Sequence, residues 1–303
     1  MTDGYLCGWR VRSELDLPEL APWTGPDIAP DVVFRFGETP TELDDVIERT
    51  PFVQVSRDGT CLLIHPGVAS YHMTGPDEVV LSVNPEASEA EVRLFLLGSV
   101  LGYLCHRRGL FPFHASCVSI NGKAVAFSGP SGAGKSTTAV SLAKRGHPLL
   151  ADDITAIDAT GSGTPIIYPA FPRLKLWQDS LSSVGIDSEG LERNRPGMSK
   201  FHYRHHEEFA AAATPLAAIF MLQKAAPGLD EQITRLERPV EIISTISSEV
   251  FRPRVGQAMG RRPALLAAQA RIASTVPVYR LVRPFDLKAI DTWLQQVEGI
   301  VGQ

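Results

Sequence analysis

The sequence predicts an α/β protein in which a small β-rich domain precedes a larger core. In residues 1–86, short runs of β-favouring residues are separated by Gly, Pro, Asp and Asn. From residue 110 onward, apolar segments with strand character alternate with segments of helical periodicity. A chain of 303 residues, 44% of them hydrophobic, is long enough for one large or two modest domains. We therefore expect a domain at 1–86, a connecting helix at 87–109 and a second domain at 110–303.

The first domain is expected to contain strands, and the connection a helix. The β-favouring runs fall at residues 32–36, 52–55, 61–65 and 78–83. Ser88 is placed to cap a helix, since acidic residues follow in the first turn and apolar residues dominate up to Cys105. This pattern predicts a long, largely buried helix that ends before Gly109.

A hairpin is predicted at the start of the second domain. Residues 113–120 and 123–128 have strand character. The Asn121-Gly122 pair between them is a strong signal for a two-residue turn. The second strand of this hairpin then leads into a Gly-rich segment.

The Gly-rich segment satisfies the pattern G-x-x-x-x-G-K-[ST] at every fixed position, and a helix is predicted after it at residues 137–145. The candidate binding residues are Gly129, Pro130, Ser131, Gly132, Ala133, Gly134, Lys135, Ser136 and Thr137. Glycines let such a loop turn its amide N–H groups inward, where they surround phosphate oxygens. Lys135 is placed to meet the β- and γ-phosphates and Ser136 to bind Mg²⁺, so we expect ATP and Mg²⁺ as ligands. A Gly-rich turn without a ligand is the alternative.

Two adjacent carboxylates close the next predicted strand. Residues 148–151 are apolar and lead into Asp152 and Asp153. Strand ends beside a phosphate loop commonly carry metal ligands and bases, so we expect one carboxylate to hold Mg²⁺ and the other to accept a proton from a hydroxyl. Ser136 and Asp153 are the candidate metal ligands, although either carboxylate fits either role. An acidic turn or a helix cap is the structural alternative.

Further elements are predicted toward the C-terminus. Strands are expected at residues 165–169, 216–223 and 278–282, and helices at residues 174–184, 240–247, 262–274 and 287–301. The stretch from Asp187 to Lys200 is rich in Arg, Asn, Pro and Gly, which predicts a mobile lid or substrate loop.

Four cations in this region are candidates for contact with phosphate or substrate. Two of them alternate with leucines, so both can lie on one side while the leucines lie against the core. Such cations can neutralise charge on a transferring phosphoryl group. A solvated surface is the alternative. The four residues are Arg173, Lys175, Arg195 and Lys200.

Composition and charge argue against several classes of protein. The formal net charge of −5 and the pI of about 5.9 provide no global positive field for a nucleic-acid backbone. The four cysteines are scattered, without the spacing of a zinc site or a disulfide framework. No signal-peptide pattern is present, and the longest apolar stretch is shorter than the ~20 residues of a spanning helix. We expect a cytoplasmic protein with reduced thiols and with no nucleic-acid or membrane partner.

The stretch from residue 113 to residue 153 resembles the catalytic domain of the HPr kinase/phosphorylase family, whose P-loop core is related to phosphoenolpyruvate carboxykinases. The matching residues are His114, the loop 129–136, the segment Lys144-Arg145-Gly146-His147 and the segment Leu150-Ala151-Asp152-Asp153. The resemblance implies an HPr-kinase-type core, with the His and the Asp pair in the active site and one Asp as base toward a serine hydroxyl. Taken alone, a His in an apolar strand is more often a core residue.

The resemblance to the HPr enzyme weakens after Asp158. The Gly-rich signature associated with oligomer contacts and phosphorolysis is not found, and residues 168–177 stand in its region. The whole chain is more similar to shorter HPr-kinase-like proteins found with peptide natural-product clusters, including lasso-peptide kinases that phosphorylate a C-terminal Ser of a precursor peptide. This implies a peptide or protein substrate bearing Ser and little phosphorolysis. A homo-oligomer is left open.

The predicted function is that of an ATP- and Mg²⁺-dependent serine kinase. The candidate catalytic residues are Asp152, Asp153, His114 and Lys135. The alternatives are an HPr-type or free-serine kinase, an ATPase that drives peptide processing, and a non-catalytic sensor in which ATP orders residues 187–200. The Asp pair beside the loop favours an enzyme, because a sensor needs no base.

Overall fold

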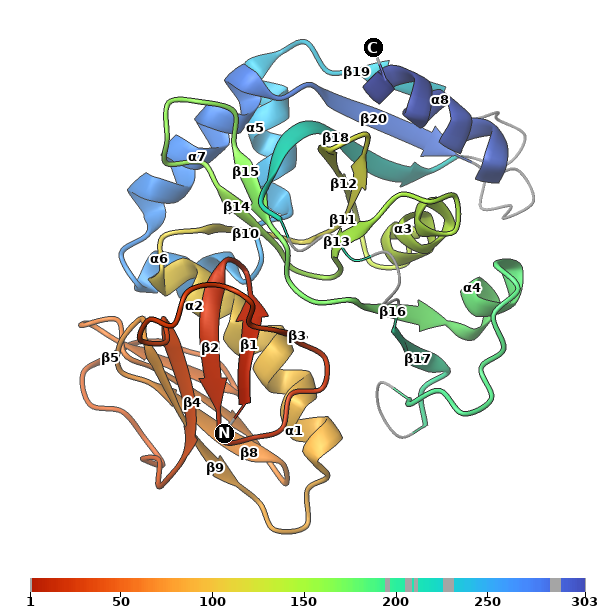
Figure 1. The fold of residues 1–303 in the computed structure, drawn as a ribbon. Coiled ribbons are helices and arrows are strands. Elements are labelled where there is room, and N and C mark those ends of the chain that lie inside the picture. Colours follow the sequence, from red (N-terminus) through yellow and green to blue (C-terminus); the bar gives the residue numbers. More distant parts are fainter. Residues whose placement is uncertain are drawn as a thin grey trace. The chain divides into compact units, whose positions relative to one another are not determined.

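A computed structural model of the chain describes residues 2–193, 197–204, 209, 212–225, 232–283 and 290–302. The chain forms two compact units (Figure 1). The first consists of Met1–Pro112 with Phe251–Ala267, and the second of Phe113–Val250 with Ala268–Gln303. The first unit is thus discontinuous in sequence, which the expected division into 1–86, 87–109 and 110–303 did not include.

One nine-stranded sheet forms the frame of the first unit, in the order β3-β1-β2-β4-β9-β8-β7-β6-β5. The predicted strands at 32–36, 61–65 and 78–83 coincide with β4, β7 and β9, and the run at 52–55 overlaps β6. The strands are β1 (Thr2–Leu6), β2 (Trp9–Ser13), β3 (Ala21–Pro22), β4 (Val32–Phe36), β5 (Val46–Arg49), β6 (Val53–Ser56), β7 (Cys61–His65), β8 (Ala69–Met73) and β9 (Glu78–Val83).

A long helical segment packs on this sheet. It consists of α1 (Glu89–Phe95), the π-helical η1 (Leu96–Val100) and α2 (Leu101–Arg107). Ser88 caps α1 as predicted, because its hydroxyl accepts from the amide of Glu91 while the Glu91 carboxylate accepts from the amide of Ser88. The Tyr71 hydroxyl of β8 donates to the Val92 carbonyl at 2.8 Å, which fixes the helix against the sheet.

Residues 251–267 return to the first unit through α6 (Pro253–Ala258). The ring of His106 contacts the Phe251 carbonyl oxygen at 2.9 Å through Nε2, and a Cβ on Gly256 would collide with the same ring. Burial lowers the pKa of His106 to about 4, so the imidazole is neutral near pH 7. An uncharged His thus fills the contact between α2 and α6.

A mixed sheet forms the frame of the second unit. The parallel strands β12, β18 and β20 are its centre, β11 is antiparallel to β12, and β13 is antiparallel to β11. The predicted turn at Asn121-Gly122 joins β11 and β12, with both residues at positive φ. The strands are β10 (Phe111–Phe113), which crosses from the first unit, β11 (Ala115–Ile120), β12 (Lys123–Ser128), β13 (Leu149–Ala151), β14 (Thr155–Asp158), β15 (Ile166–Tyr168), β18 (Thr214–Lys224), β19 (Gln232–Arg235) and β20 (Val278–Arg283).

Helices cover this sheet and bury one large apolar cluster. Val140 from α3, Phe127 from β12 and Trp293 from α8 all belong to the cluster. The predicted helices at 240–247, 262–274 and 287–301 correspond to α5, α7 and α8 over their described residues. The helices are α3 (Lys135–Ala143), α5 (Pro239–Ser248), α7 (Arg262–Thr275) and α8 (Ile290–Gly302).

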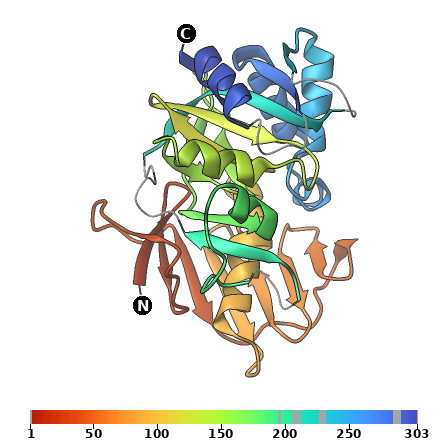
Figure 2. The same cartoon turned by 90° about the vertical axis from the view of Figure 1, so that its right-hand side faces the viewer.

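A separate ribbon of two antiparallel strands, β16 (Arg173–Trp177) and β17 (Lys200–Arg204), lies beside α3 (Figure 2). The helix predicted over 174–184 is correct only for α4 (Gln178–Ser183). The preceding residues are a strand because their apolar side chains recur every second residue, which places Leu174 and Leu176 in the buried cluster.

The helices and the cysteines bear on two further expectations, the lack of a membrane-spanning helix and the lack of disulfides. Within the described ranges, no helix combines the length and apolar character needed to cross a membrane. All four cysteines are buried and carry free thiols, as expected.

Candidate functional site

The Gly-rich loop connects the C-terminal end of β12 with the N-terminus of α3. Gly129, Gly132 and Gly134 have φ values of 138°, 80° and 91°, which L side chains rarely adopt. A Cβ on Gly129 would also lie 2.5 Å from the Leu222 carbonyl oxygen of β18. A loop with these glycine conformations, at the end of a parallel strand, is compatible with a phosphate cradle.

The ammonium group of Lys135 folds back over this loop. Its Nζ donates to the Gly129 carbonyl at 2.7 Å, and the residue is 9% exposed. Burial lowers the pKa of Lys135, while the carboxylates of Glu249, Asp153 and Asp152 oppose that shift. The cation is held by loop carbonyls, and the nearby carboxylates stabilise its charge.

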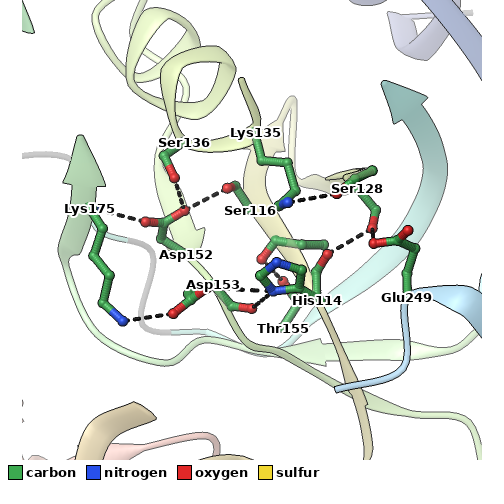
Figure 3. A network of polar contacts seen from close by, with 12 residues as sticks. His114, Ser116, Ser128, Lys135, Ser136, Asp152, Asp153, Thr155, Lys175 and Glu249 are labelled. Carbon is green, nitrogen blue, oxygen red and sulfur yellow. Dashed lines mark hydrogen bonds and ion pairs between the residues drawn. The ribbon is translucent and has the colours of Figure 1, made fainter. Parts of the chain in front are cut away.

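Asp152 is buried, and its carboxylate accepts three hydrogen bonds (Figure 3). Its Oδ1 accepts from the Ser116 hydroxyl at 2.6 Å and from the Ser136 hydroxyl at 2.8 Å. Its Oδ2 accepts from the Lys175 amide at 2.8 Å. The structure thus pairs Ser136 with Asp152, whereas the sequence-based choice of metal ligands was Ser136 with Asp153.

Asp153 faces a different set of groups. Its Oδ2 lies 2.7 Å from Lys175 Nζ, and its Oδ1 lies 3.5 Å from His114 Nδ1. Burial would raise the pKa of Asp153, but Lys175 and His114 outweigh it and hold this pKa well below the usual range of an Asp. The φ of Asp153 is 72°, a left-handed conformation that turns its side chain away from that of Asp152.

His114 lies between β10 and β11, not inside a strand. Its Nδ1 is 2.9 Å from the Asp153 carbonyl oxygen, its amide donates to the Glu249 carbonyl, and its own carbonyl accepts from the Ser128 hydroxyl at 2.7 Å. These contacts connect the end of β12, the Asp pair and the end of α5 (Figure 3).

Glu249 is a site residue that the sequence analysis missed. Its Oε2 accepts from the Ser128 hydroxyl at 3.3 Å. Of the three carboxylates that raise the pKa of Lys135 against the effect of burial, Glu249 has the largest effect. It follows α5 as a single acidic residue without a motif, so no local pattern indicated it. Ser116 is also a site residue that was missed; it is one of two serines in the buried strand β11, so its type alone did not indicate a role.

The cations predicted to contact phosphate or substrate have different partners in the structure. Lys175 pairs with Asp153, and Lys200 lies over the Trp177 ring, 5.8 Å from its centroid. Arg173 is 3% exposed, with its guanidinium over the Phe171 ring. Arg195 lies outside the described residues.

The segment Lys144-Arg145-Gly146-His147 contacts the C-terminal helix α8. Arg145 and His147 both pair with Glu298 of α8, at 2.7 Å and 2.8 Å. These residues therefore attach the C-terminal helix to the end of α3.

The donor atoms beside the loop fit a magnesium ion that also binds phosphate oxygens. The Ser136 hydroxyl and the Asp152 carboxylate are adjacent hard oxygens, which Mg²⁺ prefers, and it commonly takes only one or two protein ligands with nucleotide. Across the parts of the chain that the structure describes, no three His, Cys, Asp or Glu side chains form a metal cage. A shared site for metal and phosphate suits this donor set.

Comparison with known proteins locates a similarity in this same region. Residues 110–168 match the family model of the HPr Serine kinase C-terminal domain. The matched segment is similar to a serine kinase domain. It contains His114, the whole Gly-rich loop and the Asp pair.

Curated relatives match the chain over limited lengths. The HPr kinase/phosphorylase of Exiguobacterium sibiricum is 42% identical over 73 residues, which is 24% of this chain and 23% of the relative. That of Alkaliphilus metalliredigens is 34% identical over 139 residues, covering 44% of this chain and 42% of the relative. A solved structure, the Hpr(Ser) kinase/phosphatase from Coxiella burnetii, aligns with 63% of this chain and 99% of its own at 14% identity and a TM-score of 0.34. The chain thus spans about a quarter of the first relative's length and less than half of the second's.

Proposed function

We propose that this protein is a kinase that uses ATP and Mg²⁺ to phosphorylate a serine hydroxyl of a peptide or protein. One observation carries the proposal: two adjacent carboxylates beside a phosphate loop have separate partners. Asp152 lies against the Ser136 hydroxyl, while Asp153 lies between Lys175 and His114. The similarity of residues 110–168 to the HPr Serine kinase C-terminal domain supports this reading.

The first carboxylate suits the metal. In this proposal the loop amides and Lys135 bind the phosphates, and Ser136 and Asp152 hold Mg²⁺, which neutralises charge on the phosphoryl oxygens when bound. Asp152 replaces Asp153 in this role because only its carboxylate contacts the Ser136 hydroxyl among the described residues. The donors from Ser116 and from the Lys175 amide keep the Asp152 carboxylate fixed.

The second carboxylate suits proton transfer. Asp153 accepts the proton of the serine hydroxyl as the hydroxyl oxygen bonds to the γ-phosphorus and the bond from that phosphorus to the leaving ADP breaks. The ion pair with Lys175 makes Asp153 a weak base. In this proposal Lys175 turns toward the phosphoryl oxygens during the reaction, and the loss of the ion pair raises the pKa of Asp153 and restores its basicity. His114 keeps the carboxylate oriented.

For the acceptor, we propose a serine close to the free C-terminus of a peptide. The register of β16 and β17 places Lys175 and His202 opposite each other, and Trp177 opposite Lys200, on the face away from the buried leucines. The charge of Lys200 contributes to lowering the pKa of Asp153, so a second cation lies near this carboxylate. Such a cation can bind a terminal carboxylate.

The decisive experiment offers several acceptors to the protein with γ-labelled ATP and Mg²⁺. Mass shifts are read on a peptide ending in Ser, on its C-terminally amidated form, on free serine and on HPr. We expect transfer to the free-acid peptide and a loss of about tenfold or more in kcat/KM on amidation, because a charge-assisted hydrogen bond is worth about 1.5–3 kcal/mol. Lys135→Ala should abolish transfer.

Each other outcome points to a different function. Equal activity on the amidated peptide would reject carboxylate recognition, and comparable phosphorylation of HPr would replace the peptide with the acceptor named in the relatives. Nucleotide binding without transfer would favour a sensor. Rapid hydrolysis without a labelled acceptor would favour an ATPase.

A further inference from the structure

A buried arginine lies behind the phosphate loop. Arg283 is the last residue of β20 and pairs in register with Lys224 of the parallel strand β18. The residue is 3% exposed, and burial lowers the pKa of its guanidinium. Because an arginine cation stays protonated in proteins, its burial is costly and calls for specific contacts.

One of those contacts is made with the loop itself. Arg283 Nη2 donates to the Ala133 carbonyl oxygen at 2.6 Å. The approach is so close that a Cβ on Gly134 would collide with the same nitrogen. The φ of 91° favours glycine at this position, and a Cβ there would also force the end of the Arg283 side chain to move.

The guanidinium makes a second contact, with the ring of Trp293 in α8. Its central carbon lies 5.2 Å from the centroid of the Trp293 ring, and Trp293 of α8 is buried in the apolar cluster. This distance is within the range of a cation–π interaction, which is strengthened when the pair is desolvated. The guanidinium is held between the C-terminal helix and the loop.

We infer that Arg283 is a positioning residue for the nucleotide phosphates, acting through the peptide bond between Ala133 and Gly134. In a planar trans peptide the C=O and N–H bonds point in opposite directions. A carbonyl fixed toward Arg283 therefore turns the Gly134 amide away from Arg283, and we place the phosphates on that opposite side. This inference rests on the proposed nucleotide site and adds a residue to it.

The position of Arg283 has an electrostatic consequence as well. A buried positive charge behind the loop is poorly screened by salt, so it adds to the attraction that the amides and Lys135 exert on phosphate. Both effects act on a bound diphosphate and not on the acceptor. The structure thus predicts an effect on nucleotide affinity that exceeds any effect on the rate at saturation.

The test measures the dissociation constant of ADP with Mg²⁺ by titration calorimetry in the absence of any acceptor. Arg283→Met should raise this Kd by about tenfold or more, the size expected for a lost charge-assisted hydrogen bond. Arg283→Lys, which keeps the charge but loses the planar fork, should give an intermediate increase of roughly threefold. Arg280→Met is the matched control on the same strand, since Arg280 pairs with Glu241.

The outcomes separate this inference from the proposed function. A folded Arg283→Met protein with wild-type ADP affinity, or an increase that Arg280→Met reproduces, would overturn the role of Arg283 alone. Wild-type protein that binds no ADP would overturn the nucleotide site itself. If Arg283→Met does not fold, Arg283→Lys decides: a raised Kd and KM for ATP with little change in kcat supports the inference, and unchanged values reject it.

Discussion

At the scale of single residues, the two carboxylates after β13 have contacts that predict different losses. Asp152→Asn removes the anionic oxygen beside Ser136, so the Mg²⁺ concentration needed for half-maximal activity should rise. Asp153→Asn removes the proposed base, so kcat should fall by about 10² to 10⁴-fold with ATP affinity nearly unchanged. Steady-state kinetics at several Mg²⁺ concentrations measures both effects. Near-normal rates in both variants would remove the pair from the reaction.

Lys175 controls the charge state of Asp153. Burial alone would raise the pKa of Asp153, and Lys175 is the strongest of the groups that lower it. In Lys175→Met the pKa of Asp153 should therefore rise. Because Asp153 must be ionised to accept a proton, the acidic limb of kcat/KM should move to higher pH, while Lys175→Arg should keep the wild-type limb.

The same ion pair affects stability in a definite pH range. A carboxyl whose pKa is lower in the folded than in the unfolded protein stabilises the fold above its unfolded pKa of about 3.9. That contribution is lost as the pH falls toward the folded pKa.

In the kinetic test, an acidic limb of kcat/KM that does not move in Lys175→Met would contradict this account of Asp153.

Local patterns predicted the part of the site that is contiguous in sequence. The Gly-rich loop and the Asp pair each occupy neighbouring residues, and the structure brings them together with His114. Which Asp contacts Ser136 was not predictable, because it depends on the left-handed backbone at Asp153. Glu249 reaches Ser128 across 121 residues of sequence, a distance over which no periodicity carries information.

At the scale of elements, the capping of α1 predicts a measurable loss on mutation. Ser88→Ala removes the hydroxyl that accepts from the Glu91 amide, so the free energy of unfolding should fall by about 1 kcal/mol. Urea denaturation measures the change. Glu91→Ala tests the reciprocal bond of the same box, and a Ser88→Ala protein as stable as wild type would show that the cap contributes nothing.

The attachment of α8 to α3 predicts a pH-dependent loss. Arg145, its strongest partner, and His147 lower the pKa of Glu298, so their contribution is present above the ordinary Glu pKa of about 4.3 and is lost as the pH falls below it. Glu298→Gln should cost about 1 kcal/mol at pH 7, a modest value because the pair is partly exposed. Asp291→Asn, at a 74% exposed side chain, is the control and should change little. Equal losses in both variants would contradict this attachment.

The elements that the sequence predicted share strong local signals. The Asn121-Gly122 hairpin has a diagnostic turn pair, and α5 has a clear apolar periodicity within one segment. In contrast, β16 was read as part of a helix, because its short alternation is followed at once by helical residues. The strand β17 pairs with β16 on the far side of α4 in sequence, so no turn signal beside it predicts the pairing.

At the scale of the whole molecule, the discontinuous first unit predicts the behaviour of a truncated chain. A fragment that begins at residue 113 keeps α6 but loses α2, and with it the His106 contact to Phe251 and Gly256. We expect this fragment to bind the dye ANS and to melt at a lower temperature than the full chain. A fragment that gives a cooperative transition at the full-length Tm without dye binding would contradict the expectation.

The return of residues 251–267 to the first unit also determines when that unit can be completed during synthesis. A ribosome releases the nine-stranded sheet early, but α6 follows only after most of the second unit has emerged. N-terminal domains that are contiguous can fold as they leave the ribosome. Here the surface of α2 that receives α6 stays uncovered over the translation of more than a hundred further residues, and a nascent chain of this kind is a natural client for chaperones.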